Sequence, residues 1–131
     1  MIDELYDSNS TSDIRYKNNI ECFSDKYNLF FDKINPVRYK YINGTSSRYH
    51  TGFIAQDLVK ALEESNLTTQ DFAGVKLYHP GESDEKWYLR RDEFVALNTW
   101  QIQKLKPRMT EAEERIYKLE QELTELKSRL I

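Results

Sequence analysis

The C-terminal part of the chain carries a seven-residue apolar repeat that keeps one phase for nearly five heptads. Its a positions hold Val95, Ile102, Met109, Ile116, Leu123 and Leu130, and its d positions hold Asn98, Leu105, Ala112, Leu119 and Leu126. A helix of this length would project well beyond any domain that the remaining residues can build, so its apolar face needs partners from other chains. The repeat therefore predicts a left-handed, multistranded coiled coil.

The charges that flank this repeat favour parallel chains. Each g residue faces the e residue five positions later on a parallel neighbour. The resulting pairs are Arg108 with Glu113, Arg115 with Glu120, and Glu122 with Lys127. All three pairs are attractive. The segment from Arg115 to Glu120 also has the Arg-apolar-x-x-apolar-Glu pattern of parallel trimers, with Ile116 and Leu119 as its apolar residues, so we expect three chains.

Pro107 stands at an f position inside the repeat and removes one backbone hydrogen bond of a helix. Thr110 and Glu113 then match a capping box, which would restart a helix. Since the heptad phase continues across the proline, we expect a kink or a short break without loss of the helix axis.

The residues before the repeat predict short elements. Helices are expected from about Ser24 to Lys33 and from 55 to 65, and a hairpin over 36–53 turns at Asn43-Gly44. Two further strands are expected at 75–78 and 87–89, with Asp92 capping the long helix. The expected fold is a mostly helical α+β chain, in which a small globular part with a β-hairpin precedes a parallel trimeric coiled coil.

Composition excludes several classes of function. The chain has 131 residues and a net charge of −3, so no basic surface indicates a nucleic acid or an anionic membrane as partner. A single cysteine, Cys22, cannot form an internal disulfide, and two histidines show no metal-ligand spacing. No glycine-rich phosphate loop occurs. We therefore expect no metal and no cofactor.

Near the N-terminus, Ser12 precedes Lys17 by five residues, after a polar tract of the kind in which an accessible peptide bond is found. By itself this pair is ordinary, because Ser12 can be a helix cap and Lys17 a solvated side chain. Residues five apart do not share a face of a helix. For the two side chains to meet, a non-helical bend or a neighbouring chain is needed. Arg15 can pair with Asp13, and this structural role is the first expectation.

The order of motifs resembles the peptidase S74 family, the C-terminal intramolecular chaperones of phage tail spikes, tail fibres and neck appendages. The matching residues are Ser12-Asp13, Arg15 and Lys17 with Asn19-Ile20; Ile34-Asn35-Pro36-Val37 with Tyr39 and Tyr41; Gly52-Phe53-Ile54-Ala55-Gln56-Asp57; and Trp100-Gln101-Ile102-Gln103-Lys104-Leu105. The resemblance covers roughly residues 12 to 130.

The resemblance implies that the domain trimerises, helps an upstream β-helical stalk of the same polypeptide to fold, and then cuts itself off once. Cleavage would fall between Thr11 and Ser12, with Ser12 as nucleophile and Lys17 as base. The resemblance also divides the chain into a pre-cleavage segment (1–11), a chaperone and self-cleavage domain (12–93) and the coiled coil (94–131). Assembly would take place in the host cytoplasm, and the domain would leave the mature virion.

The donors that stabilise the oxyanion are not identified by the sequence. Backbone amides, Gln56 and His50 are candidates, although a structural hydrogen bond is the preferred role for Gln56. The alternative function is a trimerisation and capping module without chemistry, in which Ser12 and Lys17 are structural.

Overall fold

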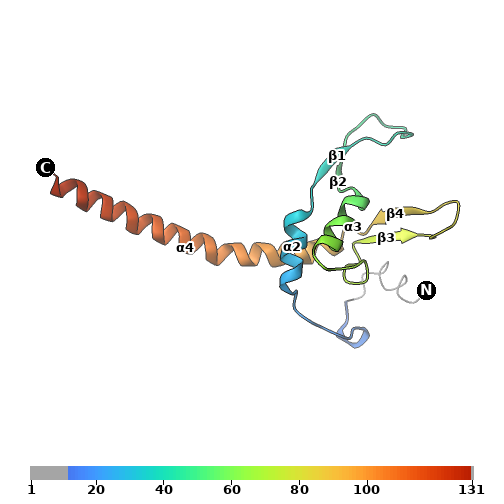
Figure 1. Cartoon of the computed structure of the whole chain (residues 1–131), viewed down its shortest axis with the longest axis horizontal. Coiled ribbons are helices and arrows are strands. Elements are labelled where there is room, and N and C mark those ends of the chain that lie inside the picture. The colour runs from blue at the N-terminus through green and yellow to red at the C-terminus, as the bar shows by residue number, and fades with distance from the viewer. Residues whose placement is uncertain (1–11, 131) are drawn as a thin grey trace.

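The computed structural model describes residues 12–130. Its elements are a 3₁₀ turn η1 (Ile14–Tyr16), α2 (Asp25–Lys33), β1 (Val37–Tyr39), β2 (His50–Gly52), α3 (Ala55–Glu64), β3 (Val75–Tyr78), β4 (Lys86–Leu89) and α4 (Glu93–Arg129). A small globular head contains α2 and α3, two hairpins project from it, and α4 extends away from it (Figure 1). The predicted α+β class, mostly helical with small hairpins and a long C-terminal helix, is confirmed.

The core of the head is formed by the facing sides of its helices. Its buried residues are Phe30 of α2, Leu58, Ala61 and Leu62 of α3, Leu67, Phe72 and Val75 of the following segment, and Phe94 and Leu97 of α4. Because Phe94 and Leu97 are 5% and 0% exposed, the first turns of α4 belong to this core. The root of the long helix is thereby fixed to the head.

A left-handed residue ends α3 and turns the chain back onto the core. Asn66 has φ 58°, the N–H of Leu67 donates to the carbonyl of Leu62 at 2.8 Å, and the N–H of Asn66 donates to Glu63. This pair of bonds is a Schellman motif. It places Leu67 against the apolar face of α3, where it is 6% exposed.

Both hairpins are antiparallel, with Val37 opposite Gly52 in one and Val75 opposite Leu89 in the other. The hairpin predicted over 36–53 is therefore confirmed, but its paired segments are shorter than the alternating pattern indicated. Tyr41 lies in the connecting loop and is 57% exposed. The alternating pattern overestimated the length of these strands, because the distal part of this hairpin has no core to pack against.

The helix α4 continues through Pro107 without interruption, and Figure 1 shows only a gentle change of direction in this orange part. The hypothesis of a new helix start at Thr110 is wrong, since the Thr110 hydroxyl donates to the Lys106 carbonyl of the preceding turn at 3.2 Å. Ser24 and Asp92 do occupy N-cap positions, but neither side chain makes a capping hydrogen bond.

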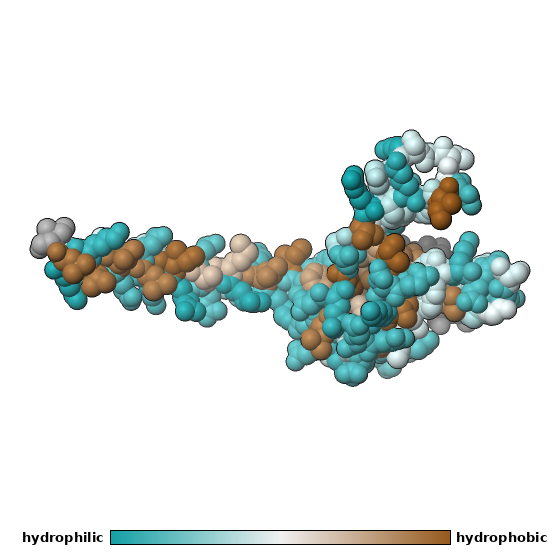
Figure 2. Space-filling view, turned by 45° about the horizontal axis from the view of Figure 1, so that its top comes forward, coloured by the Kyte–Doolittle hydropathy of each residue, from teal (hydrophilic) through white to brown (hydrophobic). Residues whose placement is uncertain are grey.

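The a and d residues from Val95 to Leu130, called the seam below, form a largely apolar row along the projecting helix (Figure 2). Their exposed fractions are 63% for Val95, 59% for Ile102, 48% for Leu105, 59% for Met109, 55% for Ile116, 59% for Leu119, 51% for Leu123, 54% for Leu126 and 79% for Leu130. The head covers none of these side chains by more than about half, so the seam is free to contact other chains. Between residues 12 and 130, no helix combines the length and the apolar character that crossing a membrane requires.

Candidate active site

The 3₁₀ turn η1 brings the side chains of Ser12 and Lys17 together within one chain. The N–H of Tyr16 donates to the Asp13 carbonyl at 3.0 Å, and the N–H of Lys17 donates to the Ile14 carbonyl at 3.1 Å. The backbone so reverses over a few residues, and Lys17 Nζ lies 2.9 Å from Ser12 Oγ. This tight turn is the non-helical bend that the sequence required, and no second chain is needed for this contact.

Asp13 and Arg15 stabilise the turn. The Asp13 carboxylate accepts the backbone N–H of Arg15 at 2.9 Å and its guanidinium Nη2 at 2.7 Å. The guanidinium, followed by the backbone N–H, holds the pKa of the Asp13 carboxyl below its ordinary value, and the same ion pair raises the pKa of Arg15. The expected structural pairing of these two residues is confirmed.

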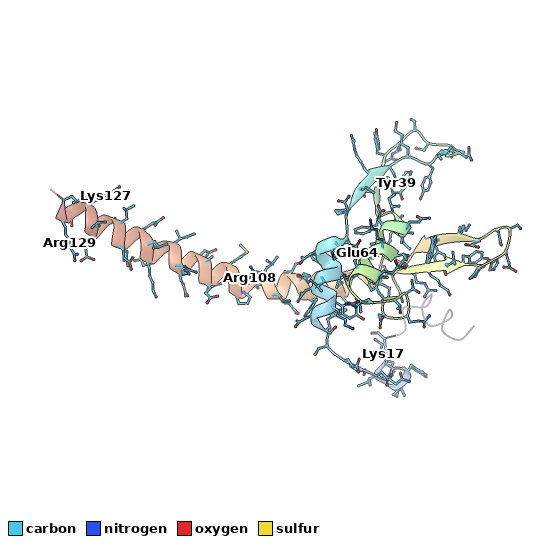
Figure 3. All side chains as sticks on the ribbon, in the orientation of Figure 1. Lys17, Tyr39, Glu64, Arg108, Lys127 and Arg129 are labelled. Carbon is cyan, nitrogen blue, oxygen red and sulfur yellow. The ribbon has the colours of Figure 1, made fainter. Side chains whose placement is uncertain are left out.

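The surface around the turn is exposed in the single chain. No residue of η1 is buried, and Ile14 and Ile20 are 73% and 67% exposed. Ser12 and Lys17 are exposed as well. Figure 3 shows Lys17 on a loop at the edge of the head, on the side opposite to Tyr39. Ser12 and Lys17 therefore have their hydrogen bond but no apolar cover in the single chain.

The two side-chain candidates for the oxyanion donors, Gln56 and His50, lie away from Ser12 and Lys17 in the single chain. Gln56 lines a groove of about 1360 Å³ between the two hairpins, and neither Ser12 nor Lys17 lines that groove. His50 stacks on Tyr39 with a centroid separation of 5.7 Å. Thr11, the other residue of the expected cleavage site, lies outside the described residues.

Two side-chain clusters were missed by sequence reasoning. The hydroxyls of Tyr39 and Tyr41 lie 3.2 Å apart, and this hydrogen bond, ahead of burial, raises the pKa of Tyr39. The alternation of tyrosines in the hairpin placed them on one face, but only the register with β2 could reveal His50 beside them.

The second cluster lies in the loop between β3 and β4. His79 Nδ1 is 2.8 Å from Asp84 and 3.2 Å from Glu82, and all three side chains are exposed. The backbone of His79 is left-handed (φ 49°), and residue spacing did not indicate this arrangement. The cluster is explained as ion pairing within the turn.

Comparisons with known proteins show what this chain resembles. A crystal structure described as a novel intramolecular chaperone matches this fold with a TM-score of 0.61 and 25% identity, over 74% of this chain and 99% of that one. Residues 12–67 match the family model of peptidase S74, the chaperone of endosialidase. This segment is therefore similar to the peptidase S74 family. No curated protein matches the chain.

Proposed function

We propose that this chain is an intramolecular chaperone that trimerises, assists the folding of an upstream β-helical fibre segment, and releases itself by cleavage between Thr11 and Ser12. The observation that carries the proposal is the 2.9 Å contact of Lys17 Nζ with Ser12 Oγ, inside the segment that matches the peptidase S74 model. In this account, residues 1–11 are the pre-cleavage segment, 12–93 the chaperone and cleavage domain, and 94–131 the coiled coil.

The chemistry begins with attack of Ser12 Oγ on the carbonyl carbon of Thr11, while Lys17 Nζ accepts the hydroxyl proton. The C–N bond then breaks, and the amine of Ser12 takes up a proton. The product is an ester between the Thr11 acyl group and Ser12 Oγ. Water hydrolyses this ester, leaving a carboxylate at Thr11 and a free hydroxyl at Ser12. Each chain turns over once.

In this proposal, cleavage depends on assembly. A lysine acts as a general base only as the neutral amine, and burial away from water favours that form. The Lys17 side chain is exposed in the single chain, and Ile14 and Ile20 beside it offer apolar surface for cover. We expect neighbouring chains or the upstream segment to cover the turn and to supply the oxyanion donors.

The chains assemble through the seam. Interwoven β trimers depend on non-local pairings that form slowly and aggregate easily. A parallel coiled coil holds three chains at high effective concentration and in alignment while those pairings form. After cleavage the stalk has lost the module that aligned it, so its stability becomes kinetic. The partners are two further copies and the upstream stalk, in the host cytoplasm during virion assembly, and the cleaved domain leaves the virion.

The test is expression of the chain with an N-terminal tag, followed by mass analysis. We expect a released fragment that ends at Thr11 and a remaining chain that begins at Ser12. Ser12→Ala and Lys17→Ala should each abolish the fragment and leave the oligomer intact. Ser24→Ala and Lys26→Ala are the matched controls, because they remove a serine and a lysine outside the turn, and they should cleave normally.

The alternative function is a trimerisation and capping module without chemistry. The exposed seam favours it as strongly as it favours the proposal, since both need the coiled coil. In that case a well-folded wild-type trimer would keep its tag indefinitely, and Ser12→Ala would change nothing.

A further inference from the structure

One seam position differs from the others in polarity. From Val95 to Leu130 the seam is apolar except at Asn98, its first d position. The Asn98 side chain is exposed and, among residues 12–130, it makes no side-chain hydrogen bond. Its amide group is therefore available to a partner that the single chain does not contain.

The head does not account for this asparagine, because it uses a different face of α4. Phe94 and Leu97 enter the core, and further along the same face Gln101 Nε2 donates to Asn28 Oδ1 at 2.9 Å. Val95, next to Asn98 in the seam, is 63% exposed. Asn98 thus lies at the level of the head but faces away from it, towards the axis of the proposed coiled coil.

An apolar seam by itself fixes the alignment of chains poorly. If one chain slides by one heptad, about 10 Å along the axis, Ile, Leu and Met still meet Ile, Leu and Met. The flanking charges discriminate only in part. In the offset alignment Arg108 faces Glu120 and the pair stays attractive, whereas Arg115 faces Lys127 and repels. Exposed pairs of this kind contribute little energy.

Asn98 discriminates between aligned and misaligned chains more strongly than the flanking charges do. In aligned parallel chains the three Asn98 amides meet at one level and can hydrogen-bond to one another. In an offset chain, Asn98 faces Leu105, and in an antiparallel chain it lies at the opposite end of the helix from its counterpart. Its amide is then buried without a partner, which is more costly than a lost surface charge pair.

We propose that Asn98 is the specificity-determining residue that sets the axial register and the parallel orientation of the chains. This inference rests on the proposed trimer and deepens it. Because Phe94 and Leu97 anchor the same helical turns in the core, a register set at Asn98 also sets the relative height of the three heads. The cleavage turns and the upstream strands are aligned with them.

The test measures register by disulfide formation in a Cys22→Ser background. Leu123→Cys is placed on one chain and Leu130→Cys on a second chain with a tag of different length, and both are co-expressed. Aligned chains give disulfides between like chains only, because a bridge needs Cα atoms within about 7 Å. An offset of one heptad brings the two different cysteines together and gives a mixed disulfide.

With Asn98 present, mixed disulfides should be rare. Asn98→Leu should raise the mixed fraction about tenfold, the discrimination expected from one unsatisfied amide, and should also raise the melting temperature of the oligomer. Adding Leu119→Asn, which places the amide in another d layer, should suppress the mixed disulfide again.

An unchanged mixed fraction in Asn98→Leu, in an oligomer that is still trimeric, would overturn the role of Asn98 while leaving the proposed function standing. So would a mixed fraction that stays high after Leu119→Asn is added. A wild-type chain that remains monomeric would instead overturn the proposed trimer, and the inference would fall with it.

Discussion

Leu119 offers a direct test of the seam, because Leu119→Ala should lose free energy only where other chains bury this side chain. The side chain is 59% exposed on α4, so Leu119→Ala should hardly affect the single chain. Burying a whole leucine side chain contributes about 1.5–3 kcal/mol. Burying the remaining 59% therefore contributes about 1–2 kcal/mol per chain, or roughly 3–5 kcal/mol for three chains. This corresponds to an increase of about 10²- to 10⁴-fold in the trimer dissociation constant.

Tyr117 is the matched control for this experiment. It lies two residues away on the same helix, is 62% exposed and occupies a b position outside the seam. Sedimentation equilibrium over a range of concentrations should show weakened trimers for Leu119→Ala and wild-type association for Tyr117→Ala. Equal effects of the two substitutions, or no effect of Leu119→Ala on association, would refute the assignment of the seam as the contact surface.

Substitutions at three further residues test the turn and the core. Lys17→Arg keeps a positive charge but replaces the amine with a group that stays protonated, so N-terminal tag release should be abolished while sedimentation shows an unchanged trimer; continued release would argue against Lys17 as base. Asp13→Ala removes both the turn cap and the Arg15 partner and should slow release more than Asp13→Asn, which keeps an acceptor for the backbone N–H. The folded-state pKa of Asp13 is lowered from 3.8. The contribution of the ionised Asp13 carboxylate to the stability of the turn is therefore fully present above pH 3.8 and is lost as the pH falls through the lowered pKa. A titration of Asp13 followed by NMR would detect this pKa. A pKa at or above 3.8 would contradict the ion pair. Ser65 is 0% exposed and its hydroxyl finds no hydrogen-bond partner among the described residues, so Ser65→Ala should leave stability unchanged or raise it by up to about 1–3 kcal/mol in denaturant unfolding; a clear loss would show that the hydroxyl is satisfied.

The sequence predicted the elements whose signals are local. The apolar periodicity of α3 and α4 and the turn residues of the first hairpin gave element types that the structure confirms. The capping-box hypothesis at Thr110 failed because a helix already in progress satisfies that segment: the backbone bond lost at Pro107 is one among many, and the f position faces away from the seam. A cap sequence competes with helix continuation only where a chain must start a helix.

The contact between Ser12 and Lys17 could not be derived from spacing alone. It depends on a 3₁₀ turn held by the Asp13 side chain and backbone bonds together, and the same residues also suit a helix start. The clustering of His50 with Tyr39 likewise depends on strand register, which a loop of this length leaves open. In the proposed function, neighbouring chains or the upstream segment cover the turn, so this cover cannot be derived from the local residues of one chain.

In the proposed function, cleavage before Ser12 requires that chains assemble through the seam. The most direct test of this requirement is the rate at which chains beginning at Ser12 appear, by mass spectrometry, as a function of chain concentration for newly folded wild-type and Leu119→Ala protein. We expect a rate that rises with the trimer fraction and, for Leu119→Ala, a shift of the whole concentration dependence to higher concentration. A rate that is the same at all concentrations and in both proteins, with cleavage in monomers, would contradict it.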